Sequence, residues 1–87
     1  MFFTYILQSQ KDLSFYIGFT SNLDQRLEQH NNATSGYTST KKPWKMVYYE
    51  IFDLQSDARK RELAIKNKKS RKYIEYLIET WKGPSYG

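Results

Sequence analysis

Residues 2–31 constrain the fold more than any other segment, because their pattern predicts a strand, a turn, a second strand and a helix. Aromatic and β-branched residues are concentrated in 2–8 and 15–19, and the residues between them are polar apart from one leucine. Such a pattern indicates a β-hairpin whose apolar face is covered by the helix that follows. We therefore expect a small α/β domain built around this hairpin.

The hairpin brings two tyrosines together if its turn is symmetric about Gln10 and Lys11. Tyr5 then lies opposite Tyr16, with their Cβ atoms ~5 Å apart, as a cross-strand pair. Gly18 stands within the second strand, where glycine is disfavoured. A glycine there indicates close approach by a side chain, a backbone or a ligand.

The helix after the hairpin is predicted to begin after Ser21 or Asn22, since either residue can cap a helix N-terminus, and to end near residue 31. Arg26 and His30 are four residues apart and therefore share one face of it. That face borders the apolar stripe that packs on the hairpin. We expect Arg26 and His30 to converge with the two tyrosines there.

The composition excludes several kinds of chemistry. The chain has 87 residues, enough for one domain, with no cysteine and one histidine. Disulfides, thiolate nucleophiles, Cys-ligated zinc and His-rich metal sites are therefore excluded. Any catalytic metal would be held by carboxylate and water, which favours Mg²⁺ or Mn²⁺. The apolar N-terminal run is too short for a signal peptide, and no run has the length of a membrane span, so we expect a cytoplasmic protein without membrane association.

Positive charge is concentrated in one segment. The formal net charge is +5, and residues 59–72 contain eight basic residues against the single acid Glu62. Such clustering favours a polyanionic partner, nucleic acid above all. The alternative is a solvated, lysine-rich helix. The basic residues are Arg59, Lys60, Arg61, Lys66, Lys68, Lys69, Arg71 and Lys72.

The rest of the chain predicts one further strand and two further helices. The expected fold is an α/β domain of the α+β type over residues 1–82, in which a three-stranded, mainly antiparallel sheet is flanked by about three helices. The last helix carries an apolar stripe at helical spacing, Tyr73, Ile74, Leu77, Ile78 and Trp81, which we assign to the core. The predicted segments are a binding or mobile loop over 31–44, a strand over 45–52, helices over 56–69 and 71–82, and a flexible tail over 83–87.

Glu62 borders the apolar side of the second predicted helix, in the sector of Ala58 and Ile65. A carboxylate in that position requires a cation to offset the cost of its desolvation. One interpretation is an ion pair, either with Lys66 one turn later or with Arg26 across the core. The other is a metal ligand that faces the tyrosines.

Taken together, these motifs resemble a GIY-YIG nuclease domain of the short stand-alone bacterial type, and the N-terminal domain of the excinuclease C subunit. Phe3-Thr4-Tyr5 takes the place of Gly-Ile-Tyr, and Tyr16-Ile17-Gly18 matches the second motif as written. Asn67 follows Glu62 too closely to match the asparagine that some relatives carry. The resemblance covers about residues 2–80. It also includes Arg26, His30-Asn31, Tyr37-Thr38, Pro43-Trp44, Val47-Tyr48-Tyr49-Glu50, Ala58, Glu62 and Lys66.

The resemblance implies a metal-dependent endonuclease that hydrolyses phosphodiester bonds in DNA, including structured or damaged DNA in repair or recombination. Glu62 would hold Mg²⁺ or Mn²⁺, and Arg26 would bind the scissile phosphate. Tyr5, Tyr16 or His30 would be the general base, a choice that the sequence leaves open together with the oligomeric state. The residues expected to hold the nucleic-acid backbone are Lys41, Lys42, Lys66, Lys68 and Lys69.

Two other functions agree with parts of the sequence. A non-catalytic nucleic-acid-binding module of the same fold would bind in a salt-sensitive manner and cleave nothing. A small scaffold protein would have no affinity for nucleic acid and would expose an apolar patch. The joint presence of Tyr5, Tyr16, Arg26, His30 and Glu62 favours the nuclease.

Overall fold

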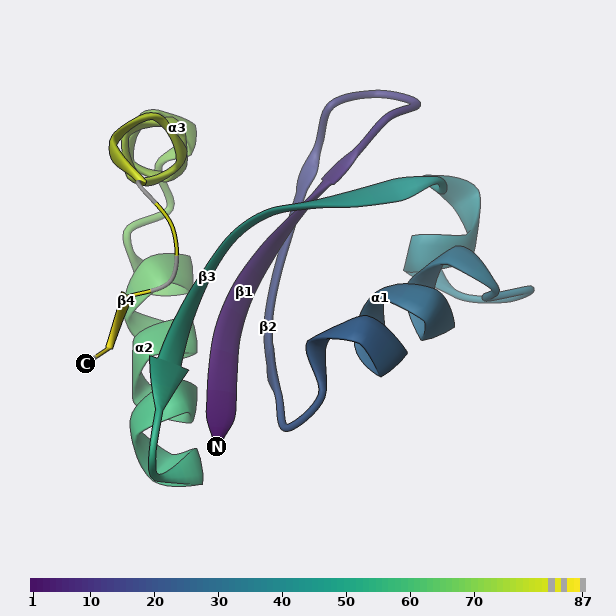
Figure 1. Cartoon of the computed structure of the whole chain (residues 1–87). Coiled ribbons are helices and arrows are strands. Elements are labelled where there is room, and N and C mark those ends of the chain that lie inside the picture. The colour runs from purple at the N-terminus through teal and green to yellow at the C-terminus, as the bar shows by residue number, and fades with distance from the viewer. Residues whose placement is uncertain (82, 84, 87) are drawn as a thin grey trace.

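The structure of the protein is a computed structural model that describes residues 1–81, 83 and 85–86. It is built on a sheet with helices on both faces (Figure 1). Three antiparallel strands form the sheet in the order β2-β1-β3, and a two-residue strand, β4, adds to β3 in parallel. The strands are β1 (Phe2–Ser9), β2 (Phe15–Thr20), β3 (Trp44–Phe52) and β4 (Ser85–Tyr86). The helices are α1 (Leu23–Asn31), the 3₁₀ helix η1 (Tyr37–Thr40), α2 (Gln55–Asn67) and α3 (Arg71–Thr80).

Strand β1 is the centre of the fold because both of its faces are covered. Ile6 packs with residues of α2 and α3, whereas Tyr5 and Leu7 pack with Leu23 and Leu27 of α1. Alternate residues of a strand point to opposite faces, so β1 contributes to two separate apolar clusters. Figure 1 shows α1 on one side of the sheet and α2 and α3 on the other.

The predicted register of the hairpin was wrong by two residues. Tyr5 lies opposite Gly18, and Tyr16 lies opposite Leu7. The turn is centred later than expected, because the Ser9 amide donates to the Ser14 carbonyl (2.8 Å) and so closes the hairpin around residues 10–13. Since side chains alternate with a period of two, this shift leaves both tyrosines on the same face of the sheet.

The turn is held in that position by its own side chains. The Ser9 hydroxyl, fully buried, accepts from the backbone amides of Lys11 (3.1 Å) and Asp12 (3.2 Å). Leu13 has a φ of 65°, which lets the chain turn back toward β2. A hydroxyl that binds two successive amides mimics a backbone turn, and nothing in the hydrophobic pattern of the strands reveals it.

The remaining elements lie within a few residues of their predicted bounds. Helix α1 is capped by Asn22, whose side chain accepts from the Gln25 amide. The core stripe predicted for α3 is confirmed, with Ile74 and Leu77 buried and the other three partly buried against the same cluster. Within the predicted tail the structure has β4, while residues 82, 84 and 87 lie outside the described residues. Among the described residues, no helix combines the length and apolar character needed to cross a membrane.

Candidate active site

Four aromatic rings from four elements meet on the α1 face of the sheet. Tyr5 of β1 stacks with Tyr16 of β2 at a centroid distance of 6.4 Å, and Tyr16 lies 4.6 Å from the ring of His30 in α1. Trp44, the first residue of β3, lies 6.1 Å from Tyr16 and 6.5 Å from His30. We call Tyr5, Tyr16, His30 and Trp44 the aromatic cluster. The predicted convergence of two tyrosines and a histidine is therefore present in the structure.

Gly18 leaves the space that the Tyr5 ring needs. A Cβ atom at position 18 would lie 2.5 Å from the Tyr5 hydroxyl oxygen and 2.7 Å from Cζ, closer than van der Waals contact allows. The phenol therefore lies across the neighbouring strand, over the one residue type that has no side chain. The close approach that the sequence indicates at Gly18 is made by Tyr5.

The Tyr5 hydroxyl is hydrogen-bonded to Nε2 of His30 at 3.2 Å. Both residues are buried, with exposed fractions of 1% for Tyr5 and 7% for His30. Burial, and then the nearby Tyr16, raises the pKa of Tyr5. Burial, and then the charge of Arg26, lowers the pKa of His30. Both groups are therefore neutral at pH 7, and we assign the phenol as donor and Nε2 as acceptor, which places the imidazole proton on Nδ1.

Arg26 lies one turn before His30 on α1 and is half-buried. Its charge lowers the pKa of His30 and opposes the effect of burial on the pKa of Tyr5. Within the part of the chain that the structure describes, its guanidinium forms no ion pair, and the predicted alternative of a bond to Glu62 is not observed. A planar cation beside two neutral acid–base groups suits a phosphate anion.

Glu62 on α2 is buried, with an exposed fraction of 7%, and is paired with two cations. Its Oε2 accepts from Nζ of Lys66 at 2.9 Å, and its Oε1 lies 3.5 Å from Nε of Arg59. The predicted ion pair between Glu62 and Lys66 is therefore confirmed. The negative charge of Glu62 contributes to the raised pKa of Tyr5, although it is the last of the causes.

Helix α2 is attached to β1 on the face of the sheet opposite the aromatic cluster. Oγ1 of Thr4, which is fully buried, donates to the carbonyl of Ala58 at 2.7 Å. Ala58 lies one turn before Glu62, and Thr4 precedes Tyr5, so this bond fixes the helix that carries the carboxylate relative to the strand that carries the phenol. Thr4 belongs to the first motif of the resemblance, but the sequence did not indicate this contact.

Glu62 is the predicted metal ligand, and its surroundings allow a test of that role. The described residues contain no group of three His, Asp or Glu side chains that could hold a metal together. Mg²⁺ in phosphoryl-transfer sites is often bound by one or two carboxylates, with water and substrate phosphates completing its coordination. One buried carboxylate fits that donor set, provided that the metal replaces Lys66 and Arg59 at its oxygens.

The predicted nucleic-acid-binding lysines are divided among three places. Lys66 is paired with Glu62, whereas Lys68 and Lys69 follow the end of α2, with Nζ of Lys68 5.2 Å from the Tyr73 ring. Lys41 and Lys42 lie in the loop between α1 and β3. Lys41 forms an ion pair with Asp12, and Lys42 donates to the Ala33 carbonyl.

Two residues of the site carried no predicted role. Trp44 belongs to the Pro-Trp pair of the resemblance, but its contact with Tyr16 and His30 does not follow from spacing. Asn31, the last residue of α1, binds both backbone groups of Trp44, accepting from its amide at 2.5 Å and donating to its carbonyl at 3.1 Å. These bonds hold Trp44 against the helix that carries His30.

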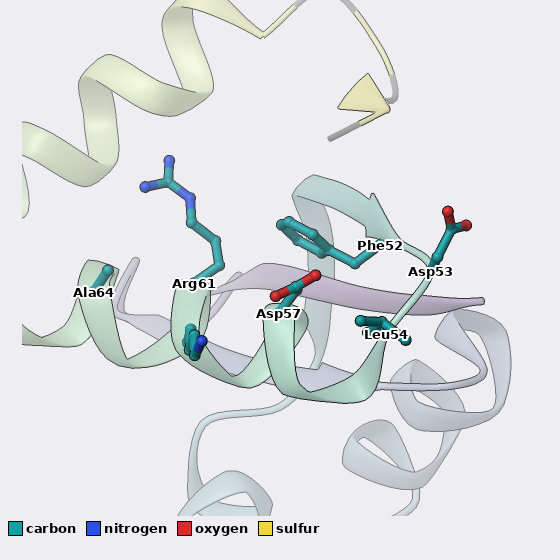
Figure 2. Close-up of a pocket in the computed structure, with 7 residues that line it drawn as sticks. Phe52, Asp53, Leu54, Asp57, Arg61 and Ala64 are labelled. Carbon is teal, nitrogen blue, oxygen red and sulfur yellow. The ribbon is translucent and has the colours of Figure 1, made fainter.

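A hollow of about 700 Å³ lies outside the aromatic cluster, between the first half of α2 and the end of β3 (Figure 2). It contains none of the predicted catalytic residues. Arg61 extends from α2 at its rim and is engaged by Glu50, with Nε 2.8 Å from Oε2. The lining residues are Phe52, Asp53, Leu54, Asp57, Lys60, Arg61 and Ala64.

The sequence and the fold are those of a known class of catalytic domain. The chain belongs to the GIY-YIG family, because the family model that describes the GIY-YIG catalytic domain matches residues 1–74, which carry every residue of the candidate site. Its curated relatives are short stand-alone members of that family, the UPF0213 proteins.

Three of these relatives show how far the similarity extends. UPF0213 protein SSP2268 from Staphylococcus saprophyticus is 37% identical over 70 residues, which cover 79% of this chain and 85% of that protein. UPF0213 protein CPE1444 from Clostridium perfringens is 43% identical over 67 residues, which cover 76% of this chain and 71% of that protein. The solution NMR structure of UPF0213 protein BH0048 from Bacillus halodurans matches with a TM-score of 0.60 and 29% identity, covering 95% of this chain and 88% of that one. The predicted family and fold class are confirmed.

Proposed function

We propose that this protein is a metal-dependent endonuclease that hydrolyses phosphodiester bonds in DNA. The observation that carries the proposal is the buried hydrogen bond between Tyr5 and a neutral His30, beside the guanidinium of Arg26. These groups can accept a proton from water and bind the phosphate that the water attacks. Membership of the GIY-YIG family supports the same reaction class.

Tyr5 and His30 act together as the general base. The raised pKa of Tyr5 disfavours a resident phenolate at pH 7, so Tyr5 needs an acceptor for its own proton. As the water gives a proton to the Tyr5 oxygen, the phenol proton moves to Nε2 of His30, which is unprotonated and 3.2 Å away. The resulting hydroxide attacks phosphorus, and the leaving oxygen departs from the opposite side. Tyr16 packs against both rings and positions them.

Arg26 and Glu62 provide the charges that the phosphate requires. Arg26 binds the non-bridging oxygens of the scissile phosphate through its planar set of donors. Glu62 holds the divalent metal, Mg²⁺ or Mn²⁺, which when bound supplies charge neutralisation and support for the leaving oxygen. Lys66, once displaced from Glu62, remains one helical turn away and contacts the nucleic-acid backbone without reading bases.

The proposal is tested by cleavage of labelled single-stranded, duplex and branched DNA, including damaged substrates, with Mg²⁺ or Mn²⁺. We expect metal-dependent products from wild type and from the control Tyr76→Phe, an exposed tyrosine on α3. Tyr5→Phe, which keeps the ring and removes the hydroxyl, and Glu62→Gln should both abolish cleavage while their circular dichroism stays native. If no substrate is cut by wild type, or if both variants cut as wild type does, the nuclease proposal is wrong.

A non-catalytic nucleic-acid-binding module is the second candidate, and one observation favours it. Both carboxylate oxygens of Glu62 already have cationic neighbours in Lys66 and Arg59, so the acid is stable in the fold without a metal. This candidate predicts that DNA binding falls steeply with salt. It also predicts that Glu62→Gln leaves binding unchanged and that no cleavage occurs with either metal.

A further inference from the structure

Aromatic rings continue from the candidate active site to the surface of the protein at Tyr37. Trp44, 3% exposed and in contact with Tyr16 and His30, also lies beside Tyr37, with a centroid distance of 6.5 Å and an interplanar angle of 36°. Tyr37 is the first residue of η1 and is 55% exposed. Its ring therefore borders the aromatic cluster at Trp44, while more than half of the residue is exposed to solvent.

The loop that carries Tyr37 is anchored along its length. Nε1 of Trp44 donates to the Thr38 carbonyl at 2.9 Å, and the Ser9 hydroxyl donates to the Lys41 carbonyl at 2.6 Å. The Gln10 amide also donates to the Pro43 carbonyl at 2.9 Å. Of the two interpretations of this loop, binding segment or mobile segment, these bonds favour a fixed binding surface. In Figure 1 the loop lies beside α1, the helix that carries His30.

One lysine lies over the Tyr37 ring, and a second binds the same loop. Nζ of Lys41 lies 5.3 Å from the ring centroid, and Lys11 reaches the same loop by donating to the Thr40 carbonyl at 3.2 Å. Asp12, paired with Lys41, balances part of this charge. An exposed aromatic ring with lysines nearby is the combination that single-strand-binding proteins use, since bases stack on the ring while the cations follow the phosphates.

We propose that Tyr37, with Lys41 over its ring and Lys11 bound to the same loop, is a subsite that stacks one unpaired base next to the scissile phosphate. The substrate class is therefore DNA with a single-stranded segment, such as a flap or an open branch, rather than continuous duplex. In a duplex the faces of the bases are covered by their neighbours and cannot reach a tyrosine. This inference rests on the proposed function for the identity of the adjacent phosphate, but the binding itself needs no cleavage.

The experiment measures binding without catalysis. Fluorescence anisotropy in EDTA at low salt compares a labelled single-stranded oligonucleotide with a duplex of the same length. The variants are Tyr37→Ala, Tyr37→Phe, which keeps the ring, and Tyr37→Leu, which keeps an apolar cover over Trp44 without a flat π-face. Tyr76→Ala is the matched control, because Tyr76 is 60% exposed and lies on α3.

Loss of one stacked base should weaken single-strand binding by Tyr37→Ala and Tyr37→Leu roughly 5-fold to 100-fold. Duplex binding should stay at the wild-type value, and Tyr37→Phe and Tyr76→Ala should match wild type on both probes. The subsite is refuted if Tyr37→Leu binds the single strand with wild-type affinity, or if its affinities for the single strand and the duplex fall equally. It is also refuted if wild type binds neither oligonucleotide. Because no metal is present, failure of the subsite is distinguishable from failure of the nuclease proposal.

Discussion

Gly18 lies directly opposite Tyr5 in the antiparallel pair of β1 and β2, and the phenol ring occupies the space of the missing side chain. The proposed general base thus depends on a residue that contributes no functional group. A methyl group at position 18 cannot be accommodated unless the ring moves away from its present position. The hydrogen bond to His30 would move with it.

Gly18→Ala should therefore affect stability and activity together. Overpacking at a buried position costs typically ~1–3 kcal/mol, and we expect a loss of that order in the free energy of unfolding. Urea unfolding followed by circular dichroism measures it, with Ser21→Ala, an exposed position between β2 and α1, as the control. Cleavage should fall further than stability explains, because Tyr5 is displaced from His30. Wild-type values in both assays would contradict the assignment of Gly18 as space for Tyr5.

Thr4→Val should destabilise the protein through the loss of one hydrogen bond. The substitution keeps the shape of the side chain but leaves the Ala58 carbonyl without the donor it has in the structure. The carbonyl keeps the helical bond from the Glu62 amide, so only one hydrogen bond is lost, and we expect the free energy of unfolding to fall by ~0.5–1.5 kcal/mol. Thr4→Ser, which retains the hydroxyl, should keep the bond and lower the free energy of unfolding by less. Equal losses for the two variants would show that packing, and not the bond to α2, accounts for the effect.

His30 should make the folded protein less stable in mild acid. Its pKa is lowered in the folded state relative to the ordinary value of 6.5, so the unfolded chain binds a proton more readily than the folded one does. The free energy of unfolding should therefore be unaffected above that pH and fall as the pH drops below it. Urea midpoints at pH 7.5 and 5.5 measure this, and since His30 is the only histidine, His30→Gln should flatten the difference. The same slope in His30→Gln would contradict the prediction.

Lys66→Met should strengthen Mn²⁺ binding if Glu62 is the metal ligand. Nζ of Lys66 now contacts the carboxylate oxygen that a cation would bind, and an exposed lysine contributes up to about 1 kcal/mol to such a pair, so affinity should rise by up to roughly five-fold. The electron paramagnetic resonance signal of free Mn²⁺ reports binding without any cleavage assay. Lys68→Met serves as the control, and Glu62→Gln should abolish binding. A lower affinity in Lys66→Met would mean that the lysine does not compete with the metal.

The parts of the site that sequence predicted are those governed by local periodicity. Arg26 and His30 share a face of α1, and Glu62 reaches Lys66, because residues four apart on a helix are neighbours. Gly18 within β2 likewise predicts a close contact, although its position in the sequence does not identify Tyr5 as the partner.

The parts that sequence did not predict depend on side chains that meet at a distance along the chain. The hairpin register was set by the Ser9 hydroxyl, which hydrophobic alternation does not detect. The bond from Asn31 to Trp44 joins the end of α1 to β3, and the bond from Thr4 to Ala58 joins β1 to α2. No periodic pattern in the sequence indicates either bond. The strand order and the support of Tyr37 by Trp44 were unpredictable for the same reason.

Thr4 and Tyr5 are consecutive residues on β1, one facing α2 and the other facing α1. The spacing between the phenol and the helix of Glu62 is therefore set by a single peptide unit at the middle of the sheet. Insertions or deletions in the hairpin turn, or in the loop that carries Tyr37, leave that spacing unaltered. The proposed chemistry and the proposed choice of substrate can thus diverge independently, with substrate preference changing through the loops while Tyr5 and the helix of Glu62 keep their separation.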